Sequence, residues 1–68
     1  MKVTRPLLVM RVDTLWPATW YAGPGPELTH TQAFARRIWD IAEAREIVLT
    51  LKDEIGGVWS IVSDRLLM

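Results

Sequence analysis

The residue types that carry out catalysis are few in this chain, and their spacing does not suit it. His30 is the single histidine, and Ser60 and Ser63 lie in an alternating segment near the other end of the chain. Nucleophilic catalysis needs a nucleophile, a base within hydrogen-bond reach and an acid that orients the base. Asp53 and Glu54 are adjacent on a predicted helix, where neighbours point about 100° apart and make a poor acid–base pair. We therefore expect no enzymatic activity and no catalytic residue.

Metal and cofactor sites are not expected either. The 68 residues include no cysteine and one histidine, a composition that argues strongly against a zinc site. The run Gly23-Pro24-Gly25-Pro26 does not suit phosphate binding, because two prolines remove backbone N–H donors that such a loop uses. This run is typical of a rigid turn.

The composition is that of a small folded domain. Half of the residues (50%) are hydrophobic, 24% are charged, and the formal net charge is zero, which argues against disorder. The longest apolar run, Leu7 to Met10, has four residues, whereas a membrane span needs about 20. Arg11 and Asp13 interrupt what would otherwise be the apolar part of a signal peptide. With no cysteine in the chain, these features favour a reduced, cytoplasmic setting.

Basic and acidic residues are unevenly distributed along the chain. Residues 1–39 hold five basic and two acidic residues, a net charge of +3, and residues 40–68 hold three basic and six acidic residues, a net charge of −3. Arg36 and Arg37 beside Trp39 suggest an alternative function as a small nucleic-acid-associated regulatory protein, because bases stack on aromatic side chains. Affinity for duplexes grows with the number of phosphates neutralised, so these dispersed cations predict no binding to duplex nucleic acid.

A helix over residues 41–55 is the clearest predicted element. Asp40 can cap its first turn, and Gly56-Gly57 can supply a left-handed C-terminal cap. Apolar residues recur every three or four positions and form one continuous stripe, made of Ile41, Ala44, Ile47, Val48, Leu51 and Ile55. This stripe predicts the face that packs on the rest of the domain.

The opposite side of this helix is acidic. Glu43, Glu46 and Asp53 lie there, and Leu49 lies between them and the basic border of the helix, away from the apolar stripe. One interpretation is a solvated helix with a single exposed leucine, which is common. The other is a contact surface, because an acidic face can dock onto a basic surface of another protein. We take Glu43, Glu46, Leu49 and Asp53 as candidate partner-binding residues.

Alternating or strand-forming residues predict three strands, over residues 7–13, 18–22 and 58–63. Residues 30–39 are ambiguous: a helical turn near 30–34 followed by a short strand near 35–39, or a continuous helix. The predicted fold is therefore α+β, a single domain over residues 1–68. It has a small antiparallel sheet of three to four strands, with one amphipathic helix (about 41–55) packed on it.

Aromatic residues supply a second candidate contact surface. Trp16, Trp20 and Tyr21 belong to the types that dominate binding hot spots. On one strand Trp20 and Tyr21 point to opposite faces, so they cannot both enter a single-sided core. The chain has four tryptophans and an apolar end at residues 66–68. We therefore expect self-association when no partner is present, most simply as a homodimer.

A short pattern links the predicted strand to the helix: Ala35-x-x-Ile38-x-Asp40-x-x-x-Ala44. It resembles the strand-to-helix junction of very small phage and prophage α+β accessory proteins. The resemblance implies a small sheet with one helix, and no activity. Together with the small size and the absence of catalytic residues, it leads to the expected function of a non-enzymatic accessory protein. Such a protein would bind a host protein or complex, in the manner of anti-defence or anti-CRISPR inhibitors. A homodimeric structural subunit is a further alternative.

Overall fold

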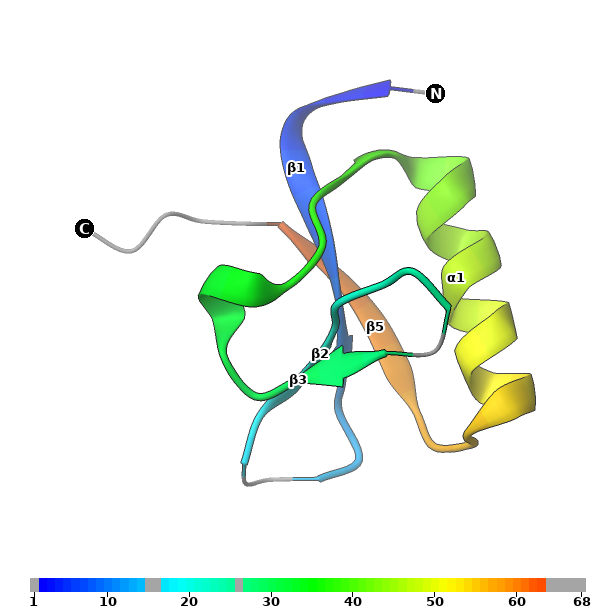
Figure 1. The fold of residues 1–68 in the computed structure, drawn as a ribbon. Coiled ribbons are helices and arrows are strands. Elements are labelled where there is room, and N and C mark those ends of the chain that lie inside the picture. Colours follow the sequence, from blue (N-terminus) through cyan, green and yellow to red (C-terminus); the bar gives the residue numbers. More distant parts are fainter. Residues whose placement is uncertain (1, 15–16, 26, 64–68) are drawn as a thin grey trace.

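Five strands, one helix and one 3-10 turn make up the part of the chain that is described, residues 2–14, 17–25 and 27–63 of a computed structural model (Figure 1). Their order is β1 (Lys2–Arg11), β2 (Thr19–Tyr21), β3 (Leu28–Thr29), η1 (Gln32–Phe34), β4 (Ile38–Asp40), α1 (Ile41–Glu54) and β5 (Trp59–Ser63). The predicted α+β class is confirmed.

The long strand β1 organises the sheet, and every pairing in it is antiparallel. Along one edge, β1 pairs with β5 from Leu7 to Arg11. Along the other edge it pairs with β2 at Met10 and Arg11, and with β4 at Lys2 and Leu7. β3 adds to the outside of β2. The sheet thus has one more strand than the three to four expected, because two-residue β3 is too short to show an alternating pattern.

Strand β1 begins at Lys2, earlier than the predicted start at residue 7, and Pro6 lies inside it. Proline cannot donate a hydrogen bond to a neighbouring strand and is tolerated at sheet irregularities. The register with β4 shifts between Lys2 and Leu7, and the pairing with β5 starts only at Leu7. Pro6 therefore lies in a stretch of β1 that has no regular pairing with β4 or β5 to interrupt.

The ambiguous segment between residues 30 and 39 forms a turn followed by a strand, as the first of the two interpretations predicted. η1 covers Gln32–Phe34, and β4 covers Ile38–Asp40. The Arg37 guanidinium donates from Nη1 to the carbonyl oxygens of Ala33 and Ala35, at 3.0 Å and 2.8 Å. These bonds fix the chain where it leaves η1, so it enters β4 in an extended conformation.

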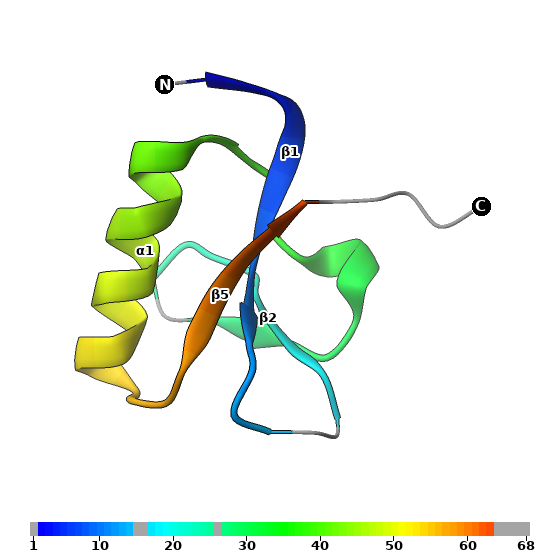
Figure 2. The same ribbon diagram turned by 180° about the vertical axis from the view of Figure 1, so that it is seen from behind.

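Helix α1 packs on one face of the sheet, and η1 lies on the other side of β1 (Figures 1 and 2). The Asp40 carboxylate accepts a hydrogen bond from the backbone N–H of Ala42 at 3.0 Å, so the predicted N-terminal cap is confirmed. The helix ends at Glu54, and Gly56, with φ of +84°, donates its N–H to the Leu51 carbonyl oxygen. Ile55, predicted to continue the apolar stripe, is 40% exposed because it lies beyond the last helical residue.

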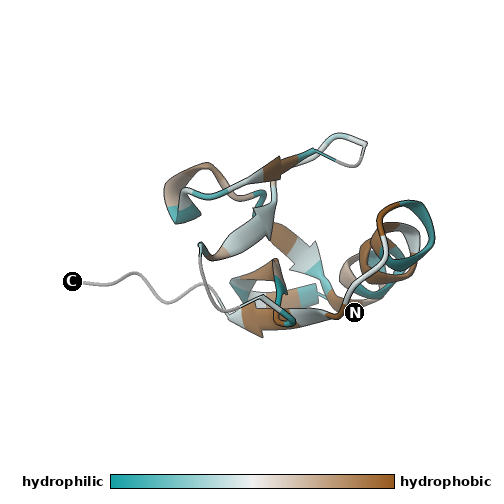
Figure 3. Cartoon of the chain, turned by 90° about the horizontal axis from the view of Figure 1, so that it is seen from below, coloured by the Kyte–Doolittle hydropathy of each residue, from teal (hydrophilic) through white to brown (hydrophobic). Residues whose placement is uncertain are grey.

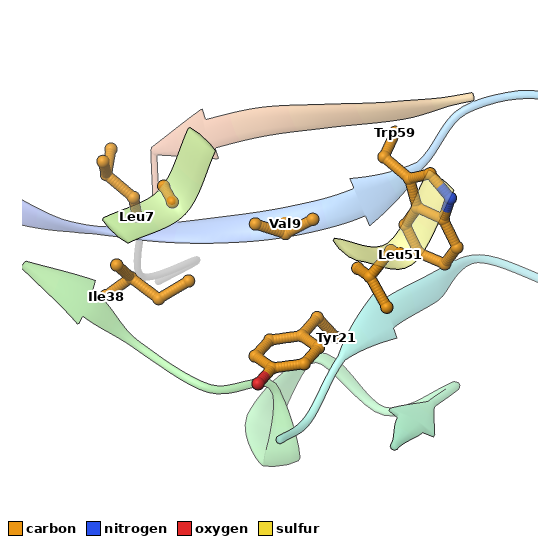
Figure 4. Close-up of a cluster of buried hydrophobic side chains, with 7 residues drawn as sticks. Leu7, Val9, Tyr21, Ile38, Leu51 and Trp59 are labelled. Atoms are coloured by element: carbon orange, nitrogen blue, oxygen red, sulfur yellow. The ribbon is translucent and has the colours of Figure 1, made fainter. Parts of the chain in front are cut away.

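The core lies between α1 and the sheet (Figure 4). Its buried members come from four strands and the helix: Leu7, Val9, Tyr21, Ile38, Ala44, Leu51 and Trp59. At one end, the Arg11 guanidinium lies over the Trp59 ring, 5.8 Å from its centroid, and Trp59 Nε1 donates to the Gly56 carbonyl oxygen at 2.9 Å. A cation over an aromatic face is attractive, so Arg11 closes this end of the core.

The tryptophans are not all hidden in this core. Trp59 is 7% exposed and Trp39 is 50% exposed, while Trp20 is half-buried. Trp16 lies outside the described residues. The small core therefore buries one of the three described tryptophans.

Candidate docking surface on the helix

The outward side of α1 follows directly from its packing. Ala44 and Leu51 are buried, with exposures of 0% and 1%, and they hold the helix against the sheet. The hydrophilic colour in Figure 3 lies on the side of α1 that faces away from the sheet. We name the outward carboxylates of this helix the acidic face: Glu43, Glu46, Asp53 and Glu54, all exposed.

The carboxylates of the acidic face are not ion-paired within the described part of the chain. None of its four carboxylates forms an ion pair with a described residue. Leu49, 66% exposed, lies on the same outward side. The face therefore offers negative charge without ion pairs, and Leu49 lies at its border, between Glu46 and Asp53 on one side and Arg45 and Lys52 on the other. Such a face complements a basic surface. The structure places all four helical candidates, Glu43, Glu46, Leu49 and Asp53, in solvent.

A pocket of about 370 Å³ lies where α1 faces the loop between β2 and β3. We name it the helix–loop pocket. It is lined by Tyr21, Gly25, Glu46, Ile47, Thr50, Leu51 and Glu54. The loop is closed by a hydrogen bond from the Ala22 N–H to the Glu27 carbonyl oxygen at 2.8 Å. The turn predicted for the Gly-Pro-Gly-Pro run is thus present at its described residues, and it forms one wall of a pocket.

Tyr21 belongs to the core and not to an exposed aromatic surface. Its side chain is 8% exposed and lies among Leu51, Val9 and Ile38 (Figure 4). The alternation of β2 brings it to the face that α1 covers, so Tyr21 does not share a surface with Trp20. The structure instead brings Tyr21 together with Glu46, another candidate, as two walls of the helix–loop pocket.

Trp20 lies on the opposite face of the sheet, away from the acidic face. It pairs with Met10 of β1 and is half-buried. We name this side the back face, with Met10, Val12, Trp20 and Val58 as its members. Val12 and Val58 are 45% and 56% exposed, and the Val12 N–H donates to the Val58 carbonyl oxygen at 2.8 Å. The back face and the acidic face are therefore separate surfaces.

Glu54, Thr50 and Gly25 are pocket residues that the sequence did not single out. Glu46, Thr50 and Glu54 follow one another four positions apart, and residues at this spacing are neighbours on a helix surface. That signal was present in the sequence. The contribution of Gly25 depends on how the loop folds back toward the helix, which no local pattern predicts.

The His30 ring lies against the start of β2. Its Nδ1 lies 3.1 Å from the Ala18 carbonyl oxygen and 3.3 Å from Thr19 Oγ1. A carbonyl oxygen can only accept, so the contact with Ala18 places the proton on Nδ1. Neither Ser60 nor Ser63 is hydrogen-bonded to the ring in the described chain. This arrangement links the start of β2 to the segment after β3.

Arg36 and Arg37 do not form a shared basic patch. The Arg37 guanidinium is occupied by the carbonyl oxygens of Ala33 and Ala35. Arg36 is exposed, and its backbone N–H donates to the Tyr21 carbonyl oxygen at 2.9 Å. One of the two cations is thus directed at the protein's own backbone, which reduces the charge available to phosphates.

The described ranges hold neither a cluster of metal ligands nor a membrane-spanning helix. There, no three histidine, cysteine, aspartate or glutamate side chains come together as a metal site would require. The helix of these ranges is neither long nor apolar enough to cross a membrane. The sequence matches no known family model, and neither curated proteins nor solved structures gave a match to it.

Proposed function

We propose that this chain is a non-enzymatic accessory protein of phage type that binds a host protein or complex in the cytoplasm. It would act stoichiometrically, in the manner of anti-defence or anti-CRISPR inhibitors. The observation that carries the proposal is the acidic face of α1 with exposed Leu49. The resemblance of the Ala35–Ala44 junction to small phage proteins supports the assignment to proteins of phage type.

The acidic face has the properties of a docking surface rather than of a scaffold. Glu43, Glu46 and Asp53 have no ion-pair partner among the described residues, so their charge is available to a partner. Complementary charge speeds encounter and fixes the register of two proteins. Leu49 adds an apolar anchor, and its 66% exposure leaves it free to be buried on binding. The helix needs none of these residues to hold its place on the sheet.

Capture from a bacterial host lysate by the tagged chain tests the proposal. The wild-type chain should retain a specific host protein, and Glu46→Lys should retain much less of it. Glu27→Lys is the matched control, because Glu27 is also an exposed carboxylate but lies in the loop before β3. Equal retention by the wild type and both variants would contradict docking through the acidic face.

A homodimeric structural subunit is the second candidate, and the back face favours it. Val12 and Val58 lie side by side on the outer surface of the sheet and are 45% and 56% exposed. Exposed apolar neighbours of this kind are typical of contact surfaces. A symmetric dimer would cover them with the same face of a second copy. This interface would leave the acidic face free, so the two functions can coexist.

A further inference from the structure

The helix–loop pocket has an apolar lining and charged ends. Tyr21, Ile47 and Leu51 contribute apolar surface, and Glu46 and Glu54 contribute carboxylates. Its volume of about 370 Å³ is within the range of about 300–1,000 Å³ that is usual for ligand pockets. The described residues that line it include no lysine and no arginine. The pocket therefore suits a ligand that is apolar along its length and positively charged at its tip.

The helix itself strengthens the negative potential at one end of the pocket. Glu54 is the last residue of α1, where the helix dipole places partial negative charge and favours a cation. Glu46 lies eight residues earlier, which is about 12 Å along the axis. One cationic group can therefore pair closely with only one of these carboxylates, and Glu54 is the favoured one.

The Tyr21 hydroxyl is an independent indication of a ligand. Tyr21 is 8% exposed, and its hydroxyl has no hydrogen-bond partner among the described residues. The hydroxyl lies next to Gly23, in the loop that also supplies Gly25 to the pocket wall. Buried polar groups normally have a partner. A ligand with several N–H donors would supply one.

We propose that the helix–loop pocket binds an arginine side chain presented by the partner protein, which names the chemistry of the docking suggested above and rests on that proposed function. The aliphatic part of arginine would lie along Ile47 and Leu51. Its guanidinium would pair with Glu54 and stack on or donate to Tyr21. Arginine fits better than lysine, because its planar fork binds carboxylates through two bonds and stacks on aromatic rings.

Titration with N-acetyl-arginine amide, followed by ¹⁵N–¹H correlation spectra of the whole chain, tests this proposal without the partner. A ligand of this size should bind with a dissociation constant on the order of 1 mM. Amide signals of Gly25 and of residues 46–54 should shift in a saturable way. N-acetyl-citrulline amide has nearly the same shape and no charge, and it should produce no saturable shift. Equal shifts with both compounds, or none with arginine, would overturn the proposal.

Two charge-matched double variants localise the site. Glu46→Gln with Glu54→Gln removes the two carboxylates of the pocket and should weaken arginine binding about fivefold, since the guanidinium pairs closely with one of them and an exposed pair contributes up to about a factor of five. Glu54→Gln alone should have the larger single effect. Glu43→Gln with Asp53→Asn removes the same charge outside the pocket and should weaken binding less than twofold by screening at ordinary salt. Equal losses of arginine affinity in both double variants would mean that arginine is attracted to the negative charge of the helix in general. That result would overturn the proposal of a binding site in the pocket.

Arginine titration and host-protein capture, both carried out with the two double variants, separate this proposal from the proposed function. Saturable arginine binding that needs Glu54, together with no retained host protein, would support the pocket and contradict docking to a host. Host binding that is lost in Glu43→Gln with Asp53→Asn and kept in Glu46→Gln with Glu54→Gln would support docking and overturn the pocket.

Discussion

The hydroxyl of Tyr21 lies against the backbone of Gly23, where a β-carbon would stand 2.6 Å from Oη and 2.8 Å from Cζ. Gly23 also has a φ of +44°, in the region that side chains disfavour. The tyrosine ring is in the core with 8% exposure, packed among other buried side chains. This contact ties the loop between β2 and β3 to the core and sets the wall of the helix–loop pocket.

Replacement of Gly23 by alanine should therefore destabilise the fold more than the same change at Gly25. At Gly25, φ is +66° and no atom lies within 4 Å of the β-carbon position, so Gly25→Ala should lose only about 1–2 kcal/mol from the backbone conformation. Gly23→Ala should lose a further 1–3 kcal/mol or so, because the methyl group displaces the ring. Urea unfolding measures both. Equal losses of unfolding free energy in the two variants would show that the Tyr21 ring can move aside without an energetic cost.

Two leucines on α1 should respond in opposite ways to truncation. Leu51 is 1% exposed and Leu49 is 66% exposed. Leu51→Ala leaves a cavity in the core and should lower the free energy of unfolding by about 2–5 kcal/mol. Leu49→Ala should change it by no more than about 0.5 kcal/mol. Thermal or urea unfolding compares the two, and a large loss in Leu49→Ala would mean that this side chain packs within the domain.

Local patterns were sufficient for most of the secondary structure. The three-four spacing of apolar residues predicted α1 to within one residue of its end, and Asp40 was recognised as its cap. The turn and strand before the helix correspond to one of the two interpretations left open for residues 30–39. β3 was not predicted, because its two residues are too few to show an alternating pattern. The first half of β1 was not predicted either, because its pairing with β4 depends on residues distant in the sequence. The register shift between Lys2 and Leu7 lets β1 continue through Pro6.

The ion pair between Arg11 and Asp13 should make the stability of the fold depend on pH in the acidic range. Arg11 Nε donates to Asp13 Oδ1 at 2.6 Å, and this hydrogen bond lowers the pKa of the Asp13 carboxyl. The pair therefore stabilises the fold above the unfolded-state pKa of about 3.9 and is lost as the pH falls through the lower folded value. Asp13→Asn should be less stable than the wild type at pH 7, and the difference should close below about pH 4. Unfolding curves at several pH values measure this, and a difference that stays constant down to pH 3 would exclude the pair as its cause.

Self-association should occur through the back face in the absence of a partner. Sedimentation at high micromolar concentration should show a dimer of the wild type. Val12→Thr with Val58→Thr should shift it toward monomer, because threonine keeps the strand preference and places hydroxyls in the contact. Leu49→Ala is the control and should leave the dimer intact. A strictly monomeric wild type would contradict the prediction.

The candidate site was only partly accessible from the sequence. The acidic face could be read from the helical spacing, since the direction of each side chain follows from the core stripe. Tyr21 was assigned to a surface because sequence alternation separates it from Trp20 without saying which of the two faces the helix covers. The pocket joins residues 21, 25 and 46–54, and only the folded loop brings these together.

The central claim is that the acidic face docks onto a host protein, and calorimetric titration of the captured protein tests it most directly. Glu43, Glu46 and Asp53 are all exposed, so reversing each to lysine should change stability by only about 0.5 kcal/mol per site. We predict saturable, stoichiometric binding by the wild type and none by the triple variant, with little change in melting temperature. A triple variant that is folded and binds like the wild type would contradict the account, and the contact would then have to lie around Trp20.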